Sequence, residues 1–172
     1  MISRRNFFGR FATAAAGGTA AAQGALAADA PADLSRHSAH RPLYVSTWTF
    51  GKTVNDRALE ARQNGADRLG AIEAGIWVAE EDAANSSVGL GGTPNADGVV
   101  QLDASCMHGP SRRAGAVGAL EGIKTPSVVA KYVLLYTDHI MLVGEGAKQF
   151  ALSYGFKEEN LLTDASRERW LH

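Results

Sequence analysis

Apolar side chains recur every three or four residues in several stretches between residues 42 and 172, and this is the spacing of a buried helical face. The clearest stripe is Leu69, Ile72, Ile76 and Ala79, which predicts a helix over about residues 66–82. A further helix is predicted at 53–63, ended by Gly65. Another begins with Thr125 as its cap and Pro126 as its first residue, and its apolar face carries Val129, Tyr132, Val133 and Tyr136. Two more are predicted: one that contains Ala147, Phe150, Ala151 and Tyr154 and is ended by Gly155, and one that Asp164 caps.

Runs rich in β-branched, aromatic or apolar residues predict strands at residues 42–50, 86–90, 99–107, 114–120 and 139–143. The small side chains of 114–120 indicate close packing, and the apolar run 139–143 is typical of a fully buried strand. A turn is expected at 95–98, and Asp103 is expected to brace a turn by accepting backbone hydrogen bonds. Helices in pairs and strands in runs indicate an α/β fold of packed layers.

The first 41 residues do not continue this pattern and instead predict export. Residues 1–27 combine a basic start (Arg4, Arg5), an alanine-rich stretch and the small-x-small sequence Ala25-Leu26-Ala27, which is the order of a cleaved signal peptide. The arginine pair followed by Phe7-Phe8 resembles a twin-arginine signal, so a periplasmic or secreted location is expected. A membrane anchor is the alternative, although the stretch is weakly apolar. Residues 28–41 are polar without a period and are expected to be a disordered lead-in.

Charge and composition then exclude several classes of function. Without the three arginines of residues 1–27, the chain has 14 basic and 18 acidic residues, a formal charge of −4, which disfavours nucleic-acid binding. The single cysteine excludes an internal disulfide. His37 and His40 have a metal-like spacing, but no cysteine or carboxylate cluster supports them, so neither a metal nor a cofactor is expected.

Three segments carry candidate chemistry. Gly144-Glu145-Gly146 follows a predicted strand, but it lacks the third glycine of a dinucleotide fingerprint and is better explained as a tight turn into a helix. Cys106 and His108 would share a strand face, although a lone buried cysteine usually only packs. Trp48 lies among hydroxyl-bearing residues, where an indole could form one wall of a polar pocket or simply pack in the core.

Eight motifs in register give the chain a specific resemblance to the glycosylasparaginases, the N4-(β-N-acetylglucosaminyl)-L-asparaginases. The similarity covers residues 42–171 almost continuously. The motifs are Val45-Ser46-Thr47-Trp48-x-Phe50-Gly51, Ala71-Ile72-Glu73-Ala74-Gly75, Ser87-Val88-Gly89-Leu90-Gly91-Gly92-x-Pro94, Asp97-Gly98 with Leu102-Asp103-Ala104, Ala116-Val117, Ile123-Lys124-x-Pro126, His139-x-Met141-Leu142-Val143-Gly144-Glu145-Gly146-Ala147, and Gly155-Phe156-x-x-Glu159-Asn160-Leu161-Leu162-Thr163. The family pattern is broken at Gly70, His108 and Asp138, which affects local capping more than chemistry.

The resemblance implies an N-terminal nucleophile hydrolase with an αββα sandwich of two sheets between helical layers. In this family a precursor cleaves itself, and the new N-terminal threonine attacks the substrate while its own α-amino group acts as base. The substrate implied is the side-chain amide of glycosylasparagine or L-asparagine. Trp48 matches an indole that lines the substrate pocket, Ser87 a serine near the nucleophile, and Phe50 an aromatic residue near the cleavage site.

The His-Asp-Thr junction, the nucleophile and the whole β chain of that family are absent from residues 42–172. The sequence therefore predicts an α-chain portion, the N-terminal half of the sandwich, that has no catalytic residue of its own and is inactive alone. It resembles a reading frame ended early or recorded in part. The expected partners are the β chain of the same precursor and a small amide substrate, with (αβ)2 assembly in the complete enzyme. The alternative is an exported remnant that acts as a small binding or structural domain.

Overall fold

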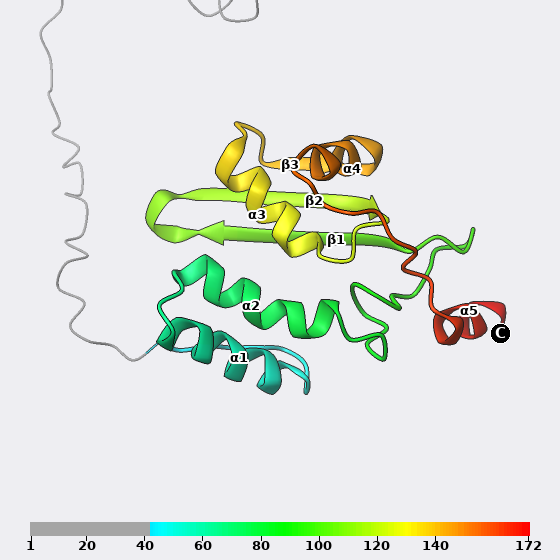
Figure 1. Ribbon diagram of the computed structural model, residues 1–172, viewed down its shortest axis with the longest axis horizontal. Helices are drawn as coiled ribbons and strands as arrows, with labels where there is room; N and C mark the ends of the chain where they lie inside the picture. The colour runs from blue at the N-terminus through cyan, green and yellow to red at the C-terminus, as the bar shows by residue number, and fades with distance from the viewer. Residues whose placement is uncertain (1–41) are drawn as a thin grey trace, which may run out of the picture. The chain divides into compact units, whose positions relative to one another are not determined.

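The computed structural model describes residues 42–172, so the predicted signal peptide, the predicted lead-in, His37 and His40 lie outside the described residues. The described part combines a small sheet with helices, which confirms the predicted α/β class (Figure 1). Along the chain it contains α1 (Gly51–Gln63), α2 (Arg68–Glu80), β1 (Gln101–His108), η3 (Gly109–Ser111), β2 (Arg113–Glu121), α3 (Pro126–Tyr136), β3 (Met141–Val143), α4 (Gly144–Ser153) and α5 (Asp164–Leu171).

The sheet has the order β1-β2-β3. β1 and β2 form an antiparallel hairpin through η3, and β3 lies parallel to β2 after the α3 crossover. The strands predicted at 99–107 and 114–120 are confirmed to within two residues at each end, and the third is shorter than predicted. Asp103 accepts a backbone hydrogen bond as expected, but at a bulge inside β1 rather than at a turn: its Oδ1 accepts the Ala119 N–H at 2.7 Å while Ala119 holds a φ of 48°.

The main core lies between one face of the sheet and the helices α3 and α4. Its side chains are Val117, Leu120, Ile123, Val129, Ala130, Val133, Ala147 and Ala151. A Cβ on Gly115 would overlap the Ala130 carbonyl, so α3 packs directly on the β2 backbone. The prediction of close packing from the small residues of β2 is therefore confirmed.

The opposite face of the sheet is open within the described residues. The strand register places Met107 beside Ala114, Ala116 beside both Ser105 and Met141, and Gly118 beside Val143. Met107, Met141 and Val143 are exposed. Residues 139–143 were expected to form a fully buried strand, which is wrong here because only one face of this edge strand is covered.

The helices α1 and α2 pack against each other as a hairpin through small residues (Figure 1). A Cβ on Gly75 would crowd the Val54 carbonyl and Ala58, so the two helices approach closely. Both helices confirm the predicted ranges, and the Asp67 side chain caps α2. The buried residues of α2 are Ala71, Gly75, Ala79 and Glu80, whereas Leu69, Ile72 and Ile76 line a hollow of about 230 Å³ beside β1.

Two predicted strands are wrong. Residues 42–46 are irregular and 47–50 turn into α1, because no strand within the described residues pairs with their backbone groups. Residues 86–90 form turns, because Gly89 and the following Gly91 hold φ of 69° and 81°, which are incompatible with an extended strand.

The predicted positions of helix ends and turns are confirmed, whereas the predicted capping side chains of α3 and α5 are wrong. Gly65, Gly98 and Gly155 hold positive φ where a helix stop or turn was expected, which confirms those three positions. Thr125 makes no side-chain cap to α3, and Thr163 rather than Asp164 caps α5 by accepting the Ser166 N–H. The first turn of α3 is capped instead by the Glu80 carboxylate of α2, which accepts the Ser127 N–H.

Candidate functional site

Trp48 and Phe50 lie in one shallow hollow at the start of α1. The hollow has a volume of about 230 Å³ and is lined by Ser46, Thr47, Trp48, Phe50, Gly51, Val54, Ile76, Ala79 and Val88. Trp48 is 68% exposed and Phe50 40% exposed, so both rings offer area to a binding partner or substrate. The structure brings the two rings together, and Trp48 is not a core residue among the described residues, whereas its role as the wall of a substrate pocket stays a prediction.

The tight turn before α1 sets the direction of these two rings. The Gly51 N–H donates to the Trp48 carbonyl at 2.9 Å, and the Thr53 N–H donates to the Phe50 carbonyl at 3.1 Å. A Cβ on Gly51 would overlap the Ser46 side chain, so the turn requires glycine at this position. A chain reversal thus brings Ser46 and Thr47 back over the helix and places Trp48 at the rim.

Ser87 is next to the hollow in the chain but does not line it. Its neighbour Val88 does. The Ser87 hydroxyl donates to Asn85 Oδ1 at 2.6 Å, and the Ser87 N–H donates to the same oxygen at 3.1 Å. The structure therefore brings Trp48 and Phe50 together and leaves Ser87 oriented by an Asx-type turn.

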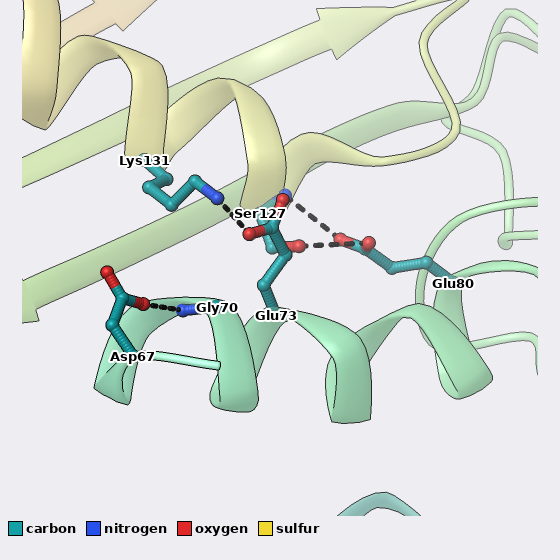
Figure 2. A network of polar contacts seen from close by, with 6 residues as sticks. All are labelled: Asp67, Gly70, Glu73, Glu80, Ser127 and Lys131. Atoms are coloured by element: carbon teal, nitrogen blue, oxygen red, sulfur yellow. Dashed lines mark hydrogen bonds and ion pairs between the residues drawn. The ribbon is translucent and has the colours of Figure 1, made fainter. Parts of the chain in front are cut away.

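A buried polar link joins α2 to α3 close to this hollow (Figure 2). Glu80 is only 1% exposed. Its two carboxylate oxygens accept from the Ser127 N–H and the Ser127 hydroxyl, each at 2.9 Å. On the same two helices, Lys131 pairs with Glu73. Burial raises the pKa of Glu80 to about 7, and the hydrogen bonds from Ser127 only partly offset this shift.

Sequence reasoning missed Glu80, although a signal was present. Glu80 follows Ile76 by four residues and so extends the predicted apolar stripe of α2. A carboxylate on an apolar helical face is rare unless it has a buried partner. That partner, Ser127, is 47 residues away in the chain and could not be located from spacing.

The remaining candidates fit structural roles. Burial raises the pKa of the half-buried Cys106 thiol, which disfavours the nucleophilic thiolate. His108 hydrogen bonds through Nδ1 to the Ser111 hydroxyl at 2.8 Å rather than to Cys106. Gly144 holds a φ of 52° at the start of α4, as expected for a strand turning tightly into a helix.

Within residues 42–172, no group of three or more histidine, cysteine or acidic side chains could hold a metal ion. None of the helices in the same range is long and apolar enough to cross a bilayer.

Comparison with known proteins gives consistent matches. The sequence model of a protein family described as asparaginase matches residues 26–172. The chain is 45% identical over 131 residues to the N(4)-(beta-N-acetylglucosaminyl)-L-asparaginase of Elizabethkingia miricola, covering 76% of this chain and 38% of that protein. It is 42% identical over 135 residues to the mouse protein of the same name, covering 78% of this chain and 39% of that protein. The chain thus spans 38–39% of the length of these relatives.

Proposed function

The chain belongs to the glycosylasparaginase and type 2 asparaginase family, and from this premise we propose that it is the α-chain portion of an exported amidohydrolase. The proposed reaction is hydrolysis of the side-chain amide of glycosylasparagine or L-asparagine. The observation that carries the proposal is the 45% identity to a glycosylasparaginase over 131 residues. The exposed Trp48 and Phe50 in one hollow support it, because a substrate pocket needs such free aromatic area.

In the proposed mechanism this chain binds and the β chain reacts. The N-terminal threonine of a β chain attacks the amide carbonyl, its α-amino group takes the hydroxyl proton, and the amine leaves as an ester forms. Water then releases the acid. The Trp48 indole and the Phe50 ring form one wall of the pocket, and the Ser87 hydroxyl lies beside the threonine once its bond to Asn85 is exchanged for a new one.

The proposed partner also completes the fold. We place a second sheet from the β chain on the open face that carries Met107, Met141 and Val143, which yields the αββα sandwich. In the complete enzyme two such αβ units associate.

We expect Trp48→Ala to weaken substrate binding in an active complex of this chain with a β chain. Removing an indole from the pocket wall loses apolar contact, so KM for glycosylasparagine should rise about tenfold or more with a smaller change in kcat. Steady-state kinetics on the purified complex measure this. Trp77→Phe is the matched control, because Trp77 lies on α2 and does not line the hollow. Equal effects of both changes would remove Trp48 from the site.

The alternative function, an exported binding or structural domain without catalysis, makes a different genetic prediction. The discriminating experiment is to read the DNA beyond the His172 codon. A frame that encodes a His-Asp-Thr junction followed by a β chain supports the hydrolase. Unrelated sequence in every frame supports the remnant.

Export is proposed to use the twin-arginine route. A fusion of residues 1–35 to a reporter should reach the periplasm, and Arg4→Lys with Arg5→Lys should reduce the exported fraction at least about tenfold, because that route reads the arginine pair. Cell fractionation with a reporter that matures before export measures this. Changing the nearby Arg10 to lysine is the control. Export of the double variant at the original level would refute the twin-arginine route.

A further inference from the structure

Glu80 makes contacts in two directions from the end of α2. Its side chain reaches forward to α3, where the carboxylate accepts the Ser127 N–H and hydroxyl. Its main chain faces back toward the loop of residues 85–92, where the Leu90 N–H donates to the Glu80 carbonyl at 2.8 Å. The same short helical turn therefore touches two segments that are remote from each other in sequence.

The loop that carries Ser87 rests directly on this turn. A Cβ on Gly89 would overlap the Glu80 backbone, so the loop approaches as closely as glycine allows. The Asn85 side chain, which orients Ser87, also donates to the Ala79 carbonyl at 3.3 Å. Both ends of the Ser87 segment are thus held by the last two residues of α2.

We propose that Glu80 is a positioning residue for Ser87: its carbonyl holds the loop 85–92 and its carboxylate ties that loop to the first turn of α3. The assignment of Ser87 to the site rests on the proposed function, whereas the coupling between loop and helix does not. A change at Ser127 should therefore loosen the loop that carries Ser87, although the side-chain hydrogen bonds of Ser127 go to Glu80 and not to that loop.

The charges around Glu80 make this link sensitive to protonation. The charged groups nearest to this link are Glu73 of α2, Glu81 just after α2, Lys124 before α3 and Lys131 on α3. Lys131 pairs with Glu73, and Lys124 lies 3.9 Å from Glu81 and 3.5 Å from Glu159. Among these groups, therefore, neither lysine forms an ion pair with Glu80, and its buried carboxylate is favoured in the neutral form.

The test is hydrogen exchange followed by mass spectrometry on the 172-residue chain carrying Met107→Lys and Met141→Lys on the open sheet face, two changes that should keep the isolated chain soluble and that serve as the parent for every variant below. Ser127→Ala removes one of the two bonds to Glu80, and exchange of Leu90 and its neighbours should become about tenfold faster. In Glu80→Ala, exchange of the same residues should become about ten- to a hundredfold faster. Glu80→Gln keeps an acceptor for the Ser127 amide and should stay close to the parent. Glu81→Gln, the same change one residue later on an exposed side chain, should have no effect.

The pH dependence separates positioning from simple capping. Because the folded pKa of Glu80 is raised from 4.5 to about 7, the folded state holds a proton that the opened state releases between these values. After correction for intrinsic exchange, opening of the loop should increase by up to about tenfold per pH unit from pH 5 to 7 and level off above. Glu80→Gln should abolish this dependence.

Two results would overturn the proposal. The first is faster exchange confined to residues 126–131 in Ser127→Ala and Glu80→Ala, with 86–92 unchanged, because Glu80 would then only cap α3. The second is a loop whose corrected exchange does not change with pH in the parent. Neither result depends on hydrolysis, so the positioning role of Glu80 can be tested even if the proposed function is wrong.

Discussion

Purified alone, the 172-residue chain should release no ammonia from L-asparagine and no aminosugar from glycosylasparagine. In the proposed reaction the attacking hydroxyl has its own α-amino group as base, and no hydroxyl in residues 42–172 has one. The Ser87 hydroxyl donates to the side-chain amide of Asn85, which is not a base. The rate should therefore lie at least about 10⁶-fold below that of an assembled enzyme.

The positive control is this chain produced together with the part of the Elizabethkingia miricola relative that lies outside the matched segment. Ammonia or aminosugar release by that preparation, lost when the proposed threonine nucleophile is changed to alanine, supports the assignment. Hydrolysis by the chain alone that survives repeated purification and is lost in Ser87→Ala would contradict it and make Ser87 the nucleophile.

Elements fixed by local contacts were predicted well from the sequence. The ranges of α1, α2, β1 and β2 follow from spacing, glycine stops and small residues, each of which acts over a few positions. The strands at 42–50 and 86–90 were wrong for different reasons. The first lacks a pairing partner within the described residues, and the second contains glycines whose positive φ only a turn can use.

The residues of the candidate site also differ in how far the sequence alone could identify them. Trp48 was predicted to line the substrate pocket and Phe50 to lie near the cleavage site, and the turn before α1 places both rings in one hollow. The importance of Ser87 came only from resemblance, because a serine in a glycine-rich loop carries no distinguishing local pattern. Glu80 was missed although a carboxylate on an apolar helical face was a signal, and its partner could not be located because only the tertiary fold brings Ser127 near.

The second large effect concerns solubility. The open face of the sheet presents Met107 on β1, 74% exposed, and Met141 and Val143 on β3, 54% and 59% exposed, with the small residues of β2 between them. Next to β3, Ile140 is also exposed, and among the described residues neither β1 nor β3 has a partner on its outer edge. Contiguous exposed apolar side chains and unpaired strand edges both favour association with other chains.

We therefore expect the isolated chain to be aggregated or molten, and a β chain supplied in trans to restore solubility before activity. Size-exclusion chromatography and dye binding to exposed apolar surface measure both states. Met107→Lys with Met141→Lys should raise the soluble fraction of the isolated chain several-fold and prevent rescue by the β chain. Leu171→Lys adds the same kind of charge at an exposed residue of α5 and should do neither.

The variant with Met107→Lys and Met141→Lys tests whether the open face is the docking site of the β chain or only a cause of aggregation. If the second sheet packs on the open face, adding charge there must both raise the solubility of the isolated chain and weaken its assembly with the β chain. The same side chains are exposed in the isolated chain and buried in the complex. Improvement with unchanged assembly would place the partner elsewhere. A parent chain that elutes as a monomer and melts in one sharp transition would show that three strands and their helices are stable with this face open, and would favour the stand-alone domain.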